Sequence, residues 1–390
     1  MLNPDLEAIQ LNSSEYKRYS RHLILPEVGI SGQKRLKAAS VLCVGTGGLG
    51  SPTLLYLAAA GIGKIGLVDF DVVDHSNFQR QIIHSTNWIG ESKIASAKHT
   101  LKELNPNCQL ETFEHAINSE NALEIIEPYD IVIDGTDNFP TRYLLNDACV
   151  ILGKPYIYGS IYRFEGQASV FNYQGGPNYR DLFPEPPPPG LVPSCAEGGV
   201  LGVLPGIIGV IQATETIKII LQQGDSLSGR LLVFNALDMK FRELKLTKNP
   251  VRAEIKTLID YNQFCNGSQT ESSNSQPQKS MEEITVQQLQ QILEAQAEDH
   301  LLVDVRNPNE YEIAQIPGSV LIPLSEIENG EGVTKVKELL GEKKLLAHCK
   351  MGGRSAKALA ILAEAGVSGS NVVGGINAWS QQIDSSVPEY

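Results

Sequence analysis

The 390-residue sequence lacks the features that mark secreted, membrane and nucleic-acid-binding proteins. Its six cysteines form no C-x-x-C pair and have no regular spacing, which excludes a disulfide framework. The first residues lack the basic start and apolar core of a signal peptide, and the longest apolar run, residues 200–211, is interrupted by glycines and a proline. No lysine- or arginine-rich run is present and the net charge is −13. We therefore expect a cytoplasmic protein with reduced thiols that binds neither nucleic acid nor a membrane.

The length exceeds what one hydrophobic core usually supports, so at least two domains are expected. Residues 266–278 have almost no apolar content, which is typical of a flexible linker. We predict a first domain over residues 1–265, a linker over 266–281 and a second domain over 282–390.

Both domains show an alternation of apolar strands and helical segments. In the first domain, strands are predicted at residues 41–44, 65–70, 109–113, 131–134 and 156–158, followed by a buried helix at 199–221 and strands at 229–235 and 241–248. In the second, strands are predicted at 301–305, 320–323, 344–348 and 371–373, with helices at 286–295 and 355–365. The pattern predicts the α/β class: a Rossmann-like doubly wound sheet, then a smaller α/β domain.

The first predicted strand runs into Gly45-Thr46-Gly47-Gly48-Leu49-Gly50 and then into an alanine- and leucine-rich helix. Glycines at this spacing let backbone N–H groups approach a phosphate at the N-terminus of the helix. Asp69 follows the next strand, where such a carboxylate usually accepts hydrogen bonds from a ribose. The motif predicts a nucleotide site, and by itself it also fits the dinucleotide of a nicotinamide-dependent oxidoreductase.

Further polar residues follow the predicted strands or lie in short loops, and parallel strands would bring them to the edge that carries the glycine loop. They are Asp71, Ser76, Asn77, Phe78, Gln79, Arg80, Lys93, Asp137 and Asn138. Taken singly, Arg80 or Lys93 is more often a solvated surface charge. Together, cations that clamp phosphates and an aspartate for Mg²⁺ favour ATP over a dinucleotide.

These residues carry a resemblance to the MoeB/ThiF family of ATP-dependent adenylyltransferases, relatives of the ubiquitin-activating enzymes, over about residues 10 to 265. The matching motifs, in order, are Arg18-Tyr19-Ser20-Arg21, Gly45 to Gly50, Asp69-Phe70-Asp71, Ser76 to Gln81, Gly90-Glu91-Ser92-Lys93 and Asp134-Gly135-Thr136-Asp137-Asn138. The resemblance implies that the glycine loop, Asp69, Asn77, Arg80, Lys93, Asp137 and Asn138 bind MgATP, with Asp137 near the metal. It also implies a homodimer in which Arg21 reaches the ATP of the partner.

In this family the substrate is the C-terminal Gly-Gly tail of a small ubiquitin-like protein. We expect the Gly- and Pro-rich loop at residues 175–193 to pass over that tail. Cys195 follows the loop and precedes the buried helix. A buried apolar role is the commoner fate of a cysteine, but relatives place here a cysteine that reacts with the activated tail or with a sulfur donor.

The sequence departs from the family at one place. Many relatives hold structural zinc with two C-x-x-C pairs, one near residues 178–181 and one near 251–254, and here neither place has a cysteine. Tetrahedral zinc needs four thiolate or imidazole ligands, which Cys265 alone does not supply. We predict ATP and Mg²⁺ but no zinc.

Cys349 lies in His348-Cys349-Lys350-Met351-Gly352-Gly353-Arg354-Ser355, between a predicted strand and a predicted helix. Backbone N–H groups, Lys350 and Arg354 would stabilise a thiolate or persulfide there. With the motifs at 303–311, 316–319 and 374–379, the loop makes residues 284–390 resemble a rhodanese-type sulfurtransferase. Related phosphatases use a loop one residue longer, so the shorter loop favours sulfur.

Together the resemblances imply that the first domain adenylates the C-terminal glycine of a sulfur-carrier protein and that a persulfide on Cys349, loaded by an upstream donor, converts it into a thiocarboxylate. Cys195 would then release the carrier. Molybdopterin synthesis is the expected pathway; thiazole synthesis, tRNA thiolation and cysteine synthesis use similar carriers. A non-catalytic binding module is the remaining alternative, and it would require the reactive residues to be missing.

Overall fold

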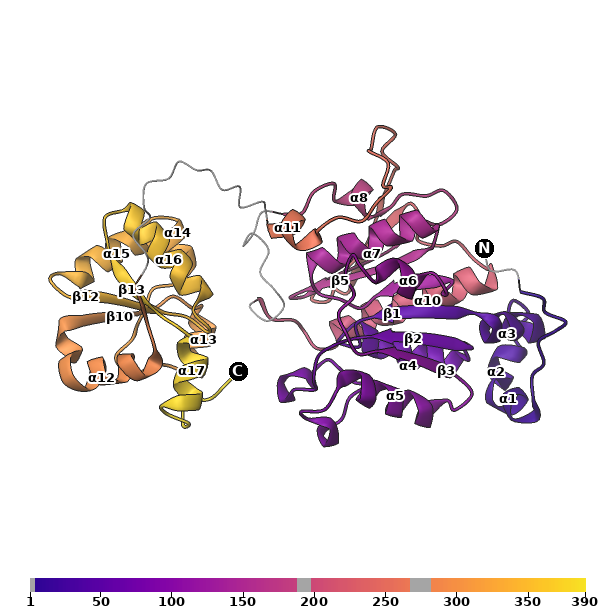
Figure 1. Cartoon of the computed structure of the whole chain (residues 1–390), viewed down its shortest axis with the longest axis horizontal. Coiled ribbons are helices and arrows are strands. Elements are labelled where there is room, and N and C mark those ends of the chain that lie inside the picture. Colours follow the sequence, from indigo (N-terminus) through magenta and orange to yellow (C-terminus); the bar gives the residue numbers. More distant parts are fainter. Residues whose placement is uncertain (1–3, 188–197, 267–281) are drawn as a thin grey trace. The chain divides into compact units, whose positions relative to one another are not determined.

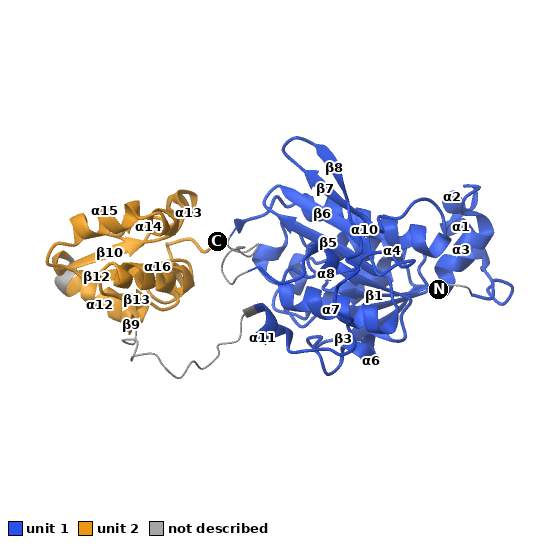
Figure 2. Cartoon of the chain, turned by 90° about the horizontal axis from the view of Figure 1, so that it is seen from above, with its two compact units in different colours: residues 1–270 blue, residues 271–390 orange. Residues whose placement is uncertain are grey.

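The computed structural model describes residues 4–187, 198–266 and 282–390. The chain divides into two compact units, residues 1–270 and 271–390 (Figure 2). Residues 267–281 of the predicted linker, the end of the Gly- and Pro-rich loop and Cys195 lie outside the described ranges.

The first unit is built on one eight-stranded sheet in the order β3-β2-β1-β4-β5-β6-β7-β8 (Figure 1). The first five strands of this order are parallel and the last three are antiparallel to their neighbours. The strands are β1 (Ser40–Val44), β2 (Lys64–Val68), β3 (Gln109–Phe113), β4 (Ile131–Asp134), β5 (Tyr156–Tyr162), β6 (Glu165–Phe171), β7 (Arg230–Asn235) and β8 (Lys240–Lys245). The α/β class is confirmed.

Helices cover both faces of this sheet, as a doubly wound fold requires. Because side chains alternate along a strand, Val41 and Cys43 of β1 belong to one hydrophobic core while Leu42 and Val44 belong to the other. The first core is closed by α3 (Gly29–Ala38), α4 (Gly50–Ala60), α5 (Lys93–Leu104) and α10 (Leu204–Leu221). The second is closed by α6 (Ala122–Ile126), α7 (Phe139–Leu152), α8 (Tyr179–Leu182) and α11 (Tyr261–Asn266).

In the first unit, β5, β6 and α10 differ from the sequence expectation. Strand β5 continues to Tyr162 and pairs with β6, which the sequence did not indicate, through a turn in which Arg163 has a φ of 53°. The turn lacks the Asn-Gly or Gly-rich signal of a tight hairpin. Helix α10 begins at Leu204 rather than at residue 199. Pro205 lies in its first turn, where a backbone N–H would have no partner within the helix, so the N–H that proline lacks is not needed.

Helix α10 is long and apolar enough to cross a membrane, by length and composition only. It packs instead within the core of the first unit, where Leu204, Ile208, Ala213 and Ile219 join the cluster that includes β1 and β2. Its Gly209 approaches α4 so closely that Thr53 Oγ1 donates to the Gly209 carbonyl at 2.9 Å. The apolar composition of α10 is therefore explained by burial.

The N-terminal helices α1 (Ser13–Arg18) and α2 (Ser20–Leu23) lie where the parallel strands begin. The hydroxyl of Tyr19, between them, accepts a hydrogen bond from Asn105, which ends α5 just before β3. The Tyr19 ring also lies against Gly61, which ends α4 just before β2. Arg21 therefore belongs to the amino edge of the sheet.

The two segments that hold zinc in many relatives are joined here by charged side chains. Arg252 forms an ion pair with Asp181, which is almost fully buried, and Asp181 also accepts the Asn249 N–H at 3.0 Å. Nearby, Arg180 donates to both oxygens of the buried Asp147 at 2.8 and 2.7 Å. No group of three or more potential ligands that could hold a metal occurs among the described residues. The absence of zinc stays a prediction.

The second unit has a five-stranded parallel sheet in the order β11-β10-β12-β13-β9. Its strands are β9 (Glu282–Ile284), β10 (His300–Asp304), β11 (Val320–Leu321), β12 (Lys344–His348) and β13 (Gly369–Val372). Its helices are α12 (Val286–Gln296), α13 (Pro308–Ile313), α14 (Leu324–Glu328), α15 (Glu331–Leu340), α16 (Gly353–Glu364) and α17 (Gly375–Gln382). A short 3₁₀ turn lies at Ala297–Asp299 in this unit, and two others lie in the first unit at His75–Asn77 and Thr86–Trp88. Strand β9 and helices α13, α14, α15 and α17 were not predicted.

Replacing Arg252 with Met should lower the free energy of unfolding of the first unit by about 1–3 kcal/mol, because Asp181 would remain buried without its counter-charge. Lys256→Met in the same segment is the control, since the pair of Lys256 with Glu254 is largely exposed and should contribute less than about 0.5 kcal/mol. Urea unfolding followed through Trp88, in a Trp379→Phe background, measures both. Equal effects would contradict the structural role of the Arg252 pair.

Candidate functional site: a glycine loop in one unit and a cradled thiol in the other

The glycine loop lies between the end of β1 and the start of α4, as predicted, and is held by direct backbone contact with the turn after β4. Gly45 has a φ of 93°, and a Cβ on it would lie 2.6 Å from the carbonyl oxygen of Gly135. A Cβ on Gly135 would in turn lie 2.5 Å from the Gly45 oxygen, and one on Gly50 would lie 2.0 Å from that same atom. Glycine is required at these three positions because no side chain fits.

Two carboxylates that follow β2 organise the loop and its cation. One oxygen of Asp69 accepts the backbone N–H of Thr46 at 2.8 Å and its hydroxyl at 2.9 Å. The Asp71 carboxylate accepts a hydrogen bond from the Lys93 ammonium at 2.9 Å, and the backbone N–H of Lys93 donates to the backbone carbonyl of Asp71. Lys93 is buried whereas Asp71 is exposed. The ammonium is thereby held at the carboxyl edge of the sheet, close to the glycine loop.

Residues 76–80 form a turn beside the same loop. Asn77 is buried, and its side chain accepts the Asp74 N–H at 3.1 Å. The Arg80 side chain lies against Gly48, and its guanidinium donates to the Ser76 carbonyl at 3.1 Å. Phe78 is half-buried and Gln79 is exposed. The turn thus places a second cation beside the glycines.

Asp137 and Asn138 follow β4, next to Gly135. Asn138 caps α7 by accepting the Thr141 N–H at 3.0 Å. Asp137 is exposed, and no hydrogen bond or ion pair of its carboxylate is described. The predicted site residues of the first unit that the structure describes are therefore collected at one edge of the sheet, except for Arg21, which lies at the opposite edge. Five-residue strands separate the two edges by about 17 Å.

Two further buried polar residues lie near the loop: Gln81, which ends the motif at residues 76–81, and His84, to which the sequence reasoning gave no role. Gln81 Oε1 and His84 Nε2 have no hydrogen-bond partner among the described residues, while His84 Nδ1 lies 3.0 Å from Ser96 Oγ. Burial, reinforced by Lys93, lowers the pKa of His84 to about 4, so its ring is neutral. Gln81 stands in the matched motif; nothing in the sequence pattern singles out His84.

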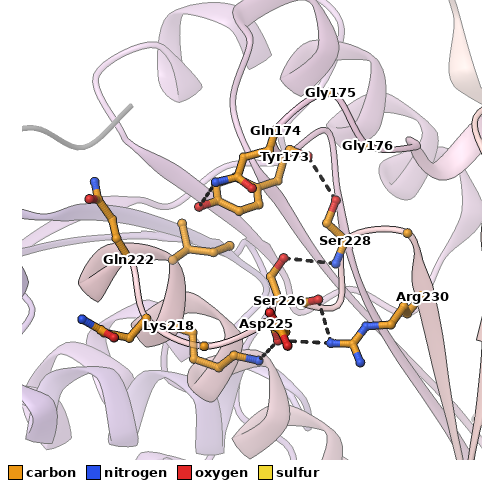
Figure 3. Close-up of a pocket in the computed structure, with 14 residues that line it drawn as sticks. Tyr173, Gln174, Gly175, Gly176, Lys218, Gln222, Asp225, Ser226, Ser228 and Arg230 are labelled. Carbon is orange, nitrogen blue, oxygen red and sulfur yellow. Dashed lines mark hydrogen bonds between the residues drawn. The ribbon is translucent and has the colours of Figure 1, made fainter. Parts of the chain in front are cut away.

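A cavity of about 700 Å³ lies elsewhere in the first unit, between the end of α10 and the start of β7 (Figure 3). Its two cations already have partners: Lys218 donates to the Asp225 carbonyl at 2.6 Å and Arg230 to the Ser226 carbonyl at 2.8 Å. Pro205, at the other end of α10, lies against Gly48. The 18-residue helix places the cavity about 27 Å from the glycine loop.

In the second unit, Cys349 lies between β12 and α16 with its sulfur facing inward. The Gly352 N–H donates to Sγ at 3.1 Å, and Ser355 Oγ lies 3.6 Å away. Gly352 has a φ of 108°, which a residue with a side chain rarely adopts. The thiol is almost fully buried within this turn. This is the predicted cradle, with one backbone N–H described as reaching the sulfur.

The two cations of the Cys349 loop, Arg354 and Lys350, differ in their electrostatic surroundings. Arg354 forms two hydrogen bonds with Glu310, at 2.6 and 2.7 Å. Burial of Glu310 opposes its ionisation, but the bonds from Arg354 and the Asn307 N–H outweigh it and lower its pKa to about 2. Lys350 is half-buried, and burial lowers its pKa. The charge of Arg354 is therefore compensated, which the sequence did not reveal.

The other described cysteines are Cys43, Cys108, Cys149 and Cys265, and all four are buried. Burial raises the pKa of Cys265 to about 11 and that of Cys108 to about 12. They pack in the hydrophobic cores of the first unit, away from the loop of Cys349.

A glycine loop with two cations in one unit and a cradled thiol in the other define a transferase with two activities. The chain belongs to the ThiF family, whose model matches residues 19–253, and carries a rhodanese-like domain at residues 285–382. The chain is an enzyme of the adenylyltransferase and sulfurtransferase class.

Curated relatives share this organisation over nearly the whole chain. The sequence is 48% identical over 388 residues to the "Probable adenylyltransferase/sulfurtransferase MoeZ" of Mycobacterium tuberculosis, covering 98% of this chain and 97% of that protein. It is 45% identical over 401 residues to the "Adenylyltransferase and sulfurtransferase MOCS3" of Culex quinquefasciatus, covering 98% and 91%. Among solved structures, E. coli MccB with ATP matches with a TM-score of 0.54 at 22% identity over 63% of this chain and 75% of that one, which shows the fold.

Gly135→Ala should weaken ATP binding by about tenfold or more, because the new Cβ would displace the Gly45 carbonyl and with it the loop. Gly153→Ala is the control: Gly153 ends α7 with a φ of 64° and open space around it, so the substitution strains the backbone away from the loop. Calorimetric titration with a non-hydrolysable ATP analogue measures both. A loss of affinity that is equal in the two variants would show that general destabilisation, rather than loop geometry, is responsible.

Proposed function

We propose that the enzyme adenylates the C-terminal glycine of a ubiquitin-like sulfur-carrier protein and then transfers sulfur from Cys349 to give a carrier thiocarboxylate. The observation that carries the proposal is the presence of both sites on one chain, a glycine loop flanked by Arg80 and Lys93 and a thiol cradle at Cys349. The names of the full-length relatives pair the same two activities.

In the first step the carrier carboxylate attacks the α-phosphate of ATP, and pyrophosphate leaves. Two anions must approach each other, so fixed positive charge lowers the barrier. Arg80 and Lys93, with the N-terminus of α4, supply that charge near the loop. Asp137, whose carboxylate has no described partner, fits a role as a ligand of Mg²⁺, which neutralises charge on the phosphates when bound. Asp69 and Asp71 keep the loop and Lys93 in position.

In the second step a terminal persulfide sulfur on Cys349 attacks the carrier acyl carbon, and AMP leaves. The product is an acyl disulfide between the carrier and Cys349. The thiolate of Cys195 then attacks the Cys349 sulfur, which releases the carrier thiocarboxylate and leaves a Cys195–Cys349 disulfide that a cellular thiol must reduce. An upstream persulfide donor reloads Cys349.

The relatives' naming supports molybdopterin synthesis as the pathway, with thiazole synthesis, tRNA thiolation and cysteine synthesis as alternatives. We further propose a cytoplasmic homodimer. Mass spectrometry of candidate carriers, incubated with the enzyme, ATP and a sulfur source, tests the pathway directly. Replacement of a carboxylate oxygen by sulfur identifies the carrier, and its absence from every carrier would refute the proposed reaction.

Cys349→Ala should abolish sulfur transfer from thiosulfate and slow thiocarboxylate formation while leaving carrier-dependent ATP–pyrophosphate exchange unchanged, because adenylation needs only the first unit. Cys265→Ala, which removes a buried thiol of the first unit, is the control and should keep both reactions. A loss of exchange in Cys349→Ala would refute this division of labour.

Arg21 lies at the opposite sheet edge from the glycine loop of its own chain, so we expect it to act only across a dimer. Arg21→Ala and Lys93→Ala should each lose most of the exchange activity. Mixing the two variants under exchange of subunits should restore part of it, because a mixed dimer has one site with both side chains intact. If the mixture stays inactive, Arg21 does not complete the site of a partner.

A further inference from the structure

Tyr390 contacts the charged groups around Cys349. Its hydroxyl accepts a hydrogen bond from Arg306 Nη1 at 2.5 Å and donates one to Glu310 Oε1 at 3.1 Å. The ammonium of Lys350 lies 4.6 Å from the centroid of the Tyr390 ring. Tyr390 therefore contacts both Lys350, which follows Cys349 in the chain, and Glu310, which pairs with Arg354.

The hydroxyl of Tyr390 is held by a buried hydrogen-bond network around Arg306. Arg306 is fully buried, pairs with Asp304 and donates to the Ala314 carbonyl at 2.7 Å. Burial raises the pKa of Tyr390 to about 12, so its hydroxyl keeps the proton that it donates to Glu310. The position of the ring is thus set by groups that do not themselves reach the sulfur.

The balance of charge around Cys349 depends on Lys350. Both Nη groups of Arg354 are used by Glu310, which compensates the guanidinium. For the Lys350 ammonium, the described part of the chain shows no hydrogen bond and no ion pair within contact distance; it lies over the face of the Tyr390 ring, and Glu310, already paired with Arg354, attracts it from farther away. An ammonium over an aromatic face is attracted to it weakly enough to be released to an anion. Lys350 is therefore the cation beside Cys349 that is available to a ligand.

We propose that Tyr390 is a positioning residue for sulfur transfer: its ring holds the Lys350 ammonium beside Cys349, where the ammonium binds the anionic end of a small sulfur donor such as thiosulfate. This inference rests on the proposed role of Cys349 as the sulfur acceptor. Tyr390 acts through Lys350 and does not touch the donor. Its effect should therefore vanish when Lys350 is absent.

Alkylation of Cys349 in the full chain tests the positioning directly. Iodoacetate and iodoacetamide react with a thiolate in the same way, but iodoacetate is an anion and iodoacetamide is neutral. The rate with iodoacetate divided by the rate with iodoacetamide, measured at the Cys349 peptide by mass spectrometry, therefore reports the local positive field. Tyr390→Leu should lower this ratio by about two- to fivefold, and Tyr390→Phe, which keeps the ring, should lower it less. Tyr311→Phe, which loses a hydroxyl bonded to the Ser319 carbonyl in the same unit, should leave it unchanged.

Lys350→Gln should lower the ratio at least as far, and the double variant Tyr390→Leu/Lys350→Gln should equal Lys350→Gln alone. The KM for thiosulfate should rise in the same pattern with little change in kcat. Additive effects in the double variant, or an unchanged ratio in Tyr390→Leu, would overturn the inference. An enzyme that forms no thiocarboxylate on any carrier would instead refute the proposed function. The two failures are distinguishable because the alkylation ratio does not depend on turnover.

Discussion

The fold depends on backbone-to-backbone contact at the turns that carry the chemistry. In the first unit, Gly45 and Gly135 approach so closely that neither tolerates a side chain, and this contact brings the turns after β1 and β4 together. In the second unit, Gly375 lies against the Cys349 carbonyl, where a Cβ would be 2.3 Å from the oxygen. Both sites are thus built on main-chain atoms, which side-chain motion does not disturb.

Charge is handled differently at the two sites. Beside the glycine loop, Lys93 is buried and fixed by Asp71, which suits a cation that must meet the phosphates in one position. Beside Cys349, Glu310 pairs with Arg354, while the contact described for the Lys350 ammonium is the face of the Tyr390 ring. The two sites thus differ in what holds their cations: Lys93 is held by a carboxylate, whereas Lys350 lies over an aromatic face.

Most of the fold follows from local pattern. Most parallel strands are predicted to within a few residues, because most of them are apolar runs followed by glycine or by a polar residue, and the cradle of Cys349 follows from its glycines. Strand β6 was missed because its turn at Arg163 has no glycine signal, and β9 because three residues carry too little pattern. The ion pair of Arg252 with Asp181 was missed because it joins residues distant in the chain.

By itself, the sequence determined the fold class, the glycine loop, the thiol and the residues that follow each parallel strand, because backbone geometry and strand direction constrain these locally. Only the tertiary structure decided which charges are compensated. It placed Arg21 at the opposite edge from the loop, paired Arg354 with Glu310 and brought Tyr390 over Lys350. Such contacts depend on how distant segments pack in three dimensions, and neither spacing nor composition encodes that arrangement.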